Sequence, residues 1–563
     1  MPLLSVHDTL KYLFGSIFIG VLLGAIGAGM ANSFRHGIVL ITNLEIHLLR
    51  SLPLFYFYFI TLSVSAIFVN LVKKKIQNSV FHGVADSIYF AHKSRDCVDI
   101  KTGMLSTLAA FISASGGASV GQYGPLVHFG TSFGVLLKRV VRIDLSSDLF
   151  IGAGVAAAIS AGFGAPIAGV LFAHEVILRH YSHTSILAIA TASGVAYAIT
   201  QYVFGISMVF DFPQHSFDLA SIITASLFSG PLFGAVAIVY MNSLFYFASL
   251  AKKIKAPEVY KILIGILFLS CIGSLLPDVM GLGTHTITSI FDADYGLMML
   301  IFILIAKIIA TSVSLNFGFF GGVFSPALLV GASTGAIIAT ILMKFGILPH
   351  FEYALVVCGM AAVTGSVIGA PITMLILVIE LTGSYIYGLA TLVGIAVSVG
   401  FTQLRFGASY FDVQLDRRGI NIAEGRIGLY LNETPVLGFC HTNFKTIYSS
   451  DIVQTAREVM SDHECAELIV ISENNEFIGK IDAISILNKE PTAELEGYID
   501  KNCVRIHDTA CLSDAMTIAS DFVGEFIPII DENQNLVVGV ISENALFAAY
   551  LNEQRKINET EKQ

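Results

Sequence analysis

The sequence predicts an all-α membrane domain with many helices in two related halves, followed by a small α/β module. Its 563 residues are 55% hydrophobic and only 13% charged, about half the charged fraction of an average soluble protein. Long apolar stretches recur up to Arg405, and short motifs occur twice at matching positions. The formal net charge of -10 comes without a basic stripe, so no nucleic-acid partner is indicated.

Eight apolar stretches are near or beyond the roughly 18 residues that cross a bilayer. Lysines at 73–75 and at 252, 253 and 255 follow two of them, which favours a cytoplasmic location for those ends. Residues 1–8 lack the basic start of a cleavable signal, so we expect the first stretch to be retained. Lys307 lies inside an apolar stretch, and we expect it to snorkel to an interface. The stretches are residues 12–30, 54–72, 150–172, 186–203, 222–250, 262–276, 297–315 and 353–381.

An internal repeat divides the apolar region into two halves. The tetrapeptide Gly-Ala-Pro-Ile at 164–167 is followed by Glu175, and the same tetrapeptide at 369–372 is followed at the same spacing by Glu380. Broken backbone at membrane depth is tolerated only where protein or a water-filled cavity covers it. The repeat therefore predicts two related helical halves.

A glycine-proline break lies upstream of each copy, at residues 121–125 and 322–326. Paired breaks at corresponding positions point to a binding site near the middle of the bilayer. The first N-H groups of a helix are unpaired and carry partial positive charge, so two such helix starts can replace the water around an anion. Glycine allows close approach of the backbone, and proline in the first turn wastes no donor. The alternative is that these residues only let helices pack closely.

The composition changes near residues 405–418, and we place the domain boundary there, with a membrane domain at 1–418 and a tail at 419–563. Within the tail, a pattern of strand, polar turn, strand and helix occurs twice, at about 440–490 and 500–555. Each half resembles a CBS domain. The seven cysteines contain no CxxC pair, so neither a metal site nor a disulfide framework is indicated, and a reducing cytoplasmic tail fits.

The membrane segments resemble the CLC family of chloride channels and proton-coupled chloride antiporters. Residues 121–125 are similar to the GxEGP motif of that family, 322–326 to its GxFxP motif and 81–88 to its GSGIP motif, and the GAPIAGVLF run at 164–172 agrees. The resemblance implies a homodimer in the cell membrane. Each subunit would hold its own chloride pore among about eighteen helices in two inverted halves.

Carried over by motif, the resemblance implies that backbone N-H groups of Val323 and Phe324 hold a central anion and that those of Tyr123 and Gly124 face an outer one. Tyr123 stands where the antiporters place their gating glutamate, and a phenol with a pKa of about 10 cannot exchange protons at neutral pH. Val176 stands where they place the internal proton acceptor. We therefore expect passive chloride movement, uncoupled from protons. The alternative is a proton-coupled antiporter that uses unfamiliar groups such as His82 or His174.

Three positions leave alternatives open. The ring of Tyr123 either gates the path or packs out of the way. At the inner end, His82 replaces the serine of the family motif, next to Gly83, and its imidazole is either an anion ligand or a satisfied structural residue. The aromatic residue that ends the pore is Phe411 by spacing or Tyr410 by residue type.

No constellation of nucleophile and base appears in the apolar helices, so an enzyme is not indicated. We expect no cofactor besides the transported anion. CBS pairs often bind adenosine nucleotides through a Ser or Thr with Asp three residues later, whereas Ser542 is followed by Ala545. An adenine nucleotide at the tail, and with it a nucleotide-sensing function, stays as an alternative to a structural role.

Overall fold

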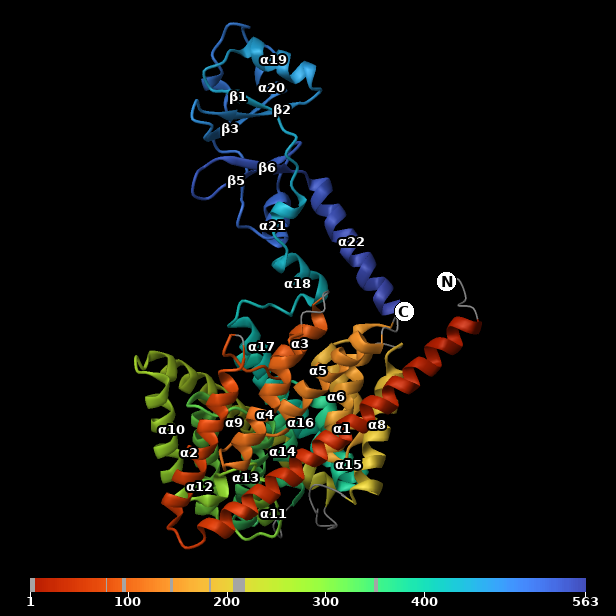
Figure 1. Cartoon of the computed structure of the whole chain (residues 1–563), viewed down its shortest axis with the longest axis vertical. Coiled ribbons are helices and arrows are strands. Elements are labelled where there is room, and N and C mark those ends of the chain that lie inside the picture. Colours follow the sequence, from red (N-terminus) through yellow and green to blue (C-terminus); the bar gives the residue numbers. More distant parts are fainter. Residues whose placement is uncertain are drawn as a thin grey trace. The chain divides into compact units, whose positions relative to one another are not determined.

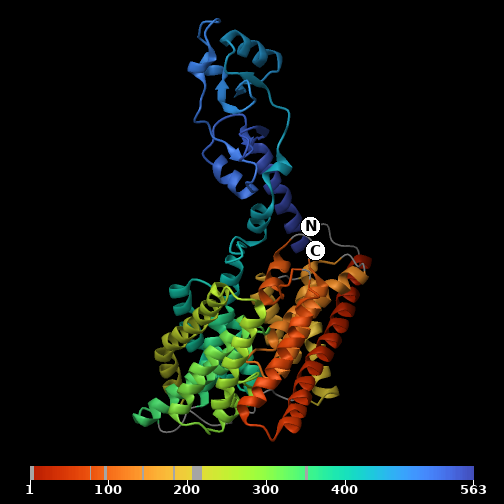
Figure 2. The same cartoon turned by 60° about the vertical axis from the view of Figure 1, so that its left-hand side comes forward.

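A computed structural model describes residues 6–76, 78–93, 98–141, 145–181, 184–205, 218–348 and 353–562. The chain forms two compact units, of which the first ends at Gly419 and the second runs from Ile420 to Lys562. The first unit is a bundle of helices, and the second combines two small sheets with short helices (Figures 1 and 2). This is the predicted fold class, an all-α membrane domain followed by an α/β module.

Helices of very different length make up the first unit, because glycines and prolines interrupt its apolar sequence. In chain order they are α1 (Val6–Leu49), α2 (Leu54–Lys73), α3 (Val84–His92), α4 (Ile100–Ser115), α5 (Tyr123–Val141), α6 (Ser147–Phe163), α7 (Pro166–Phe172), the π-helix η1 (Ala173–Leu178), α8 (Ile186–Ala198), the π-helix η2 (Ile199–Val203), α9 (Leu219–Lys253), α10 (Glu258–Leu275), the 3₁₀ helix η3 (Pro277–Val279), α11 (Thr284–Phe291), α12 (Leu297–Asn316), α13 (Phe324–Lys344), α14 (Tyr353–Ile368), α15 (Pro371–Thr382), α16 (Tyr385–Phe406) and α17 (Tyr410–Asp416).

Within the described residues, eight helices are long and apolar enough to cross a membrane, and six of them match predicted stretches. The stretches 150–172 and 353–381 are each split in two, because Gly164 and Gly369 adopt the left-handed conformation at φ 69° and 74°. Pro166 and Pro371 then begin α7 and α15, where a missing N-H costs nothing. Conversely, α13 and the segment from Tyr385 to Asp416 qualify as spans.

The two halves repeat one arrangement of helices. In the first half α5 packs on α6, and in the second α13 packs on α14. Both contacts are backbone to backbone: a Cβ on Gly130 would lie 2.3 Å from the carbonyl oxygen of Gly154, and a Cβ on Gly331 would lie 2.3 Å from that of Gly359. The repeat predicted from the Gly-Ala-Pro-Ile motifs therefore extends over three successive helices in each half.

The sequence context of Lys307 suggested that its side chain snorkels to an interface. In the structure, Lys307 lies in α12 and its side chain does not reach an interface. Its side chain is fully buried, and its ammonium donates hydrogen bonds of 3.0 Å to the carbonyl oxygens of Val279 and Gly281. The last residue of η3 and the turn that follows it present these two oxygens to the cation. A buried ammonium is tolerated where such acceptors replace its water.

The tail has two similar halves. Each contains a three-stranded sheet, ordered β1-β2-β3 and β4-β5-β6, in which the first pair is parallel and the second antiparallel. One apolar cluster, which includes Ile469, Phe477 and Ile530, joins the two sheets. The repeated α/β pattern predicted for the tail is confirmed. Its elements are α18 (Gly425–Glu433), η4 (Val436–Phe439), β1 (Thr446–Tyr448), α19 (Val453–Asp462), β2 (Glu467–Ile471), β3 (Phe477–Asp482), α20 (Ala483–Ile486), η5 (Leu495–Tyr498), β4 (Ile506–His507), α21 (Leu512–Ala519), β5 (Ile527–Ile530), β6 (Val537–Ile541) and α22 (Glu543–Lys562).

Candidate anion site

The starts of α5 and α13, which are far apart in sequence, meet inside the first unit. Gly121 and Gly322 exchange two backbone hydrogen bonds of 2.7 Å each, and each helix begins two residues further on. This approach needs glycine, because a Cβ on Gly121 would lie 2.8 Å from the carbonyl oxygen of Gly322. The two glycine-proline breaks therefore bring two helix N-termini to one place.

These N-termini are buried and uncapped. Tyr123, Val323 and Phe324 are at most 4% exposed, and among the described residues no acceptor is found for the backbone N-H groups of Tyr123, Gly124, Val323 or Phe324. Buried N-H groups without a partner are rare in proteins and are costly. A helix start that stays uncapped inside the protein indicates a place where a ligand accepts these hydrogen bonds.

The neighbouring pair of helix starts shows what such an end attracts. At the start of α7, the backbone N-H groups of Ile167 and Ala168 each donate a 2.8 Å hydrogen bond to the Glu380 carboxylate. At the start of α15, the N-H groups of Ile372 and Thr373 donate to the Glu175 carboxylate, at 3.0 and 2.7 Å. Each half thus supplies the carboxylate for the other half. The starts of α7 and α15 hold fixed anionic groups, whereas no described residue supplies one to the starts of α5 and α13.

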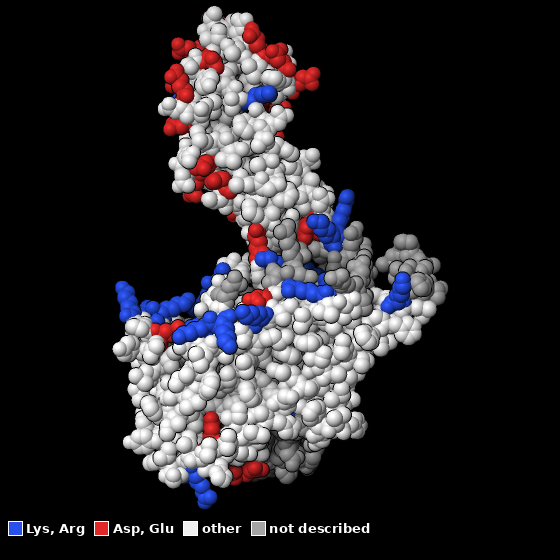
Figure 3. Space-filling view, in the orientation of Figure 1, with Lys and Arg blue, Asp and Glu red and all other residues white. Residues whose placement is uncertain are grey.

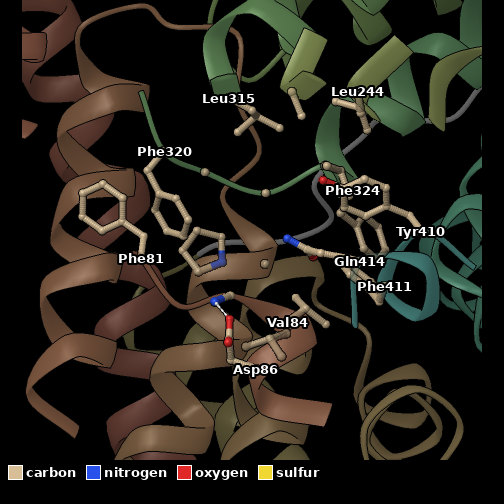
Figure 4. A pocket seen from close by; sticks show the side chains of 18 of the residues that line it. Phe81, Val84, Asp86, Leu244, Leu315, Phe320, Phe324, Tyr410, Phe411 and Gln414 are labelled. Carbon is tan, nitrogen blue, oxygen red and sulfur yellow. Dashed lines mark hydrogen bonds between the residues drawn. The ribbon is translucent and has the colours of Figure 1, made fainter. Parts of the chain in front are cut away.

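A cavity of about 310 Å³ opens onto the uncapped ends (Figure 4). Its wall is formed by the start of α3, the start of α5, the ends of α9 and α12, the segment 320–324 and α17. Phe81, Phe320 and Phe324 present rings on this wall, and Asn316 and Gln414 bring side-chain amides. The lining therefore combines apolar rings with polar and charged groups, a suitable surface for a small, partly dehydrated ion.

Positive charge exceeds negative charge on the described lining of this cavity. Lys252, Arg417 and Arg418 contribute cations, and Asp86 is the acidic group among them. The Asp86 carboxylate is neutralised locally, because it accepts a 2.7 Å bond from the Arg418 guanidinium and another of 2.7 Å from the Gly83 backbone N-H. The guanidinium of Arg417 lies 3.9 Å from the centre of the Phe245 ring. Such a wall favours anions over cations.

Tyr123 closes one end of this space with its ring. The ring stacks on Phe163 with centroids 3.7 Å apart and meets Phe324 edge-on at 5.5 Å. The residue is 1% exposed, and its hydroxyl has no hydrogen-bond partner among the described residues. Phe163 and the stack that it makes were not anticipated from the sequence, because no motif marks the last residue of α6.

Of the residues singled out in the sequence, the structure brings most to the cavity. Seven line it, but His82 is not part of the lining, because its ring packs against His128 and Phe90 at 5.7 and 5.8 Å between centroids. Val176 is buried in η1, outside the lining. Tyr410 and Phe411 both reach the wall, and Tyr410 stacks on Phe245 at 5.1 Å. The seven lining residues are Gly83, Tyr123, Gly124, Val323, Phe324, Tyr410 and Phe411.

Sequence reasoning missed Asp86, Arg418 and the role of the repeated glutamates. The glutamates were visible as part of the repeat, and their equal spacing from the Gly-Ala-Pro-Ile motifs was a usable signal. No pattern linked Asp86 to Arg418, which are 332 residues apart. Pairs of this kind become visible only once the chain has folded.

Comparison with known proteins decides the family. The model of a family described as "Voltage gated chloride channel" matches residues 62–403, which is more than half of the chain. The chain belongs to this chloride channel family. Its apolar helices and this membership together establish that the chain is a multi-pass membrane protein.

Curated relatives of this voltage-gated chloride channel family member include proteins named as exchangers and one named as a channel. An "H(+)/Cl(-) exchange transporter ClcA" of Vibrio cholerae is 27% identical over 310 residues, which cover 54% of this chain and 66% of that protein. A "Putative chloride channel protein ClcB-like" of Ralstonia nicotianae is 26% identical over 292 residues, which cover 50% of this chain and 67% of that one. In both cases the matched stretch spans about two thirds of the relative.

Solved structures agree on the fold. The structure of a slow cyanobacterial Cl-/H+ antiporter covers 72% of this chain with a TM-score of 0.64 and 20% identity. That of a eukaryotic CLC transporter covers 95% of this chain and 98% of its own, with a TM-score of 0.62 and 16% identity. Because the second match takes in the tail as well, the order of membrane bundle and α/β module is shared.

Proposed function

We propose that this member of the family conducts chloride or similar small inorganic anions passively, as a channel or uniporter. The observation that carries the proposal is the meeting of two buried, uncapped helix N-termini at the end of a cavity whose charge is mostly positive. Backbone dipoles stabilise an anion there without a full charge, which would bind it too tightly for rapid exit. Glu380 and Glu175 are fixed groups at the starts of α7 and α15. In this proposal the conducted anion takes the corresponding place at the starts of α5 and α13 as a mobile ligand.

Proton coupling is absent in this proposal. Tyr123 and Val176, at the positions that the resemblance assigns to proton carriers, do not titrate near neutral pH. The experiment is a flux assay in liposomes with imposed chloride and proton gradients. We expect chloride to run down its gradient, with a reversal potential that follows chloride alone. Protons driven uphill by a chloride gradient, in a fixed ratio, would refute the uncoupled mechanism.

The second candidate is a proton-coupled exchanger that uses other groups. Two observations favour it: relatives are named as exchangers, and the rings of the half-buried His82 and the buried His128 lie 5.7 Å apart behind the inner end of the cavity. The same gradients discriminate the two functions, and replacing both histidines by glutamine would abolish proton movement only if they carry it.

For the tail we propose a pair of CBS domains on the cytoplasmic side, with a structural role. The cytoplasmic side is supported by the lysines and arginines gathered at one end of the first unit (Figure 3), since basic residues favour that side. We also propose a homodimer, as the resemblance implies. A titration of residues 420–562 with ATP and AMP tests the sensing alternative, because saturable binding would favour it over the structural role.

A further inference from the structure

Arg35 is a cation in the middle of the apolar helix α1, and the cavity described above does not account for it. A charged side chain at membrane depth is costly and marks a functional position more often than a packing one. Arg35 is half-buried and makes no ion pair with an acidic residue in the described ranges. It is also absent from the lining of the cavity. Its charge is therefore neither cancelled by a neighbour nor used at the inner end of the path.

The contacts of Arg35 place it close to the two residues of α6 that pack on the Tyr123 ring. Its guanidinium donates a 2.6 Å hydrogen bond to the carbonyl oxygen of Gly162, near the end of α6. Gly162 touches the same ring, because a Cβ there would lie 3.1 Å from its Cδ1 and Cε1 atoms. The next residue, Phe163, stacks on Tyr123. Since Tyr123 lines the cavity and Arg35 does not, the guanidinium reaches this layer of rings from the side away from the cavity.

Two polar atoms close to this position have no partner in the described part of the chain. They are the Tyr123 hydroxyl and the Oε1 atom of Gln122, and these residues are 1% and 4% exposed. A guanidinium has five N-H donors, and its described hydrogen bond uses only one carbonyl oxygen. A cation with spare donors thus lies beside buried polar groups that lack a partner.

We propose that Arg35 supplies the positive charge of the outer end of the anion path and determines how strongly small inorganic anions bind there. This rests on the proposed function and extends it to a residue of α1, outside the helix starts that form the central site. When the ring of Tyr123 moves aside, an anion beyond it meets the guanidinium and the Tyr123 hydroxyl together. Selectivity at the outer end then comes from a full charge, whereas the inner end uses backbone dipoles.

The test compares Arg35→Gln with Arg35→Lys in planar bilayers, with chloride varied on one side at a time. Glutamine keeps a donor for Gly162 but removes the charge, and lysine keeps the charge. A unit charge about 6 Å from an ion, at an effective dielectric constant of about 40 for a path open to water, changes binding by roughly tenfold. We expect R35Q to raise the half-saturating chloride concentration about tenfold from the Tyr123 side only, and R35K to stay within about threefold of the parent. The matched control is Arg50→Gln, which removes an exposed charge just beyond the same helix.

Two outcomes would overturn the proposal. In one, R35Q gives the parent's half-saturation on both sides. In the other, R35K loses as much as R35Q although both elute and melt like the parent, which would show that the charge of Arg35 does not determine how strongly the anion binds. A parent protein that moves no chloride at all would instead contradict the proposed function, so the two failures are distinguishable.

Discussion

Replacing Tyr123 by alanine tests whether its ring closes the anion path. In the structure the ring is held by a stack on Phe163 and an edge contact with Phe324. Each aromatic pair is worth about 0.5 to 1.5 kcal/mol, so moving the ring aside costs about 1 to 3 kcal/mol. At 1.4 kcal/mol per tenfold, the open arrangement is populated roughly 5 to 150 times less than the closed one. Alanine should therefore raise chloride flux by a factor within roughly that range.

The assay is chloride efflux from liposomes at equal protein content, with Tyr123→Phe as the matched control. Phenylalanine keeps both ring contacts and loses only the hydroxyl, so we expect its flux to stay close to that of the parent. The alanine variant also loses buried ring area, which costs about 3 to 5 kcal/mol of stability, so its fold is checked by gel filtration and melting. A folded Y123A protein with parental flux would refute the gate, and so would a Y123F protein as leaky as Y123A.

Three further predictions concern charges. Arg418→Gln leaves the Asp86 carboxylate unpaired on the cavity wall, so we expect a severalfold loss of chloride flux that the double variant with Asp86→Asn restores; no rescue would contradict the electrostatic explanation. Glu380→Gln weakens two charge-assisted hydrogen bonds and should lower stability by about 1.5 to 3 kcal/mol, measured by thermal unfolding in detergent against the exposed control Asp292→Asn. In the tail, the buried Lys480 pairs with Glu467 and donates 2.7 Å to the Phe526 carbonyl oxygen. Lys480→Met should lower the free energy of unfolding by about 3 to 5 kcal/mol, measured by chemical unfolding. The double variant Lys480→Met with Glu467→Leu should lose distinctly less, and an equal loss would contradict a role for the pair.

Local patterns in the sequence predicted the helix starts of the site because each depends on residues next to one another. Gly121 and Pro125 define one start, and Gly322 and Pro326 the other, and the structure joins them through the two glycines. The tail was predicted for the same reason, since its strands and turns are short-range features.

The features that were not predicted depend on contacts between distant segments. Whether the ring of His82 faces the cavity is decided by His128 on another helix. Lys307 was misinterpreted because its acceptors, Val279 and Gly281, lie at the end of η3 and in the turn after it, which meet the cation only in the folded protein. The apolar stretch at 150–172 was read as a single span because apolar length outweighed the local signal of Gly164 and Pro166.

The exchange of glutamates between the halves makes neither half self-sufficient. Glu380 and Ile167 are 213 residues apart, and Glu175 and Ile372 are 197 residues apart. Contacts over such separations form late in folding, because a long loop must close first. During synthesis the start of α7 therefore lies in the bilayer without its Glu380 partner until the second half has been made and inserted. Two separately expressed fragments, cut between η2 and α9, should consequently assemble into one working unit, while either fragment alone stays incomplete.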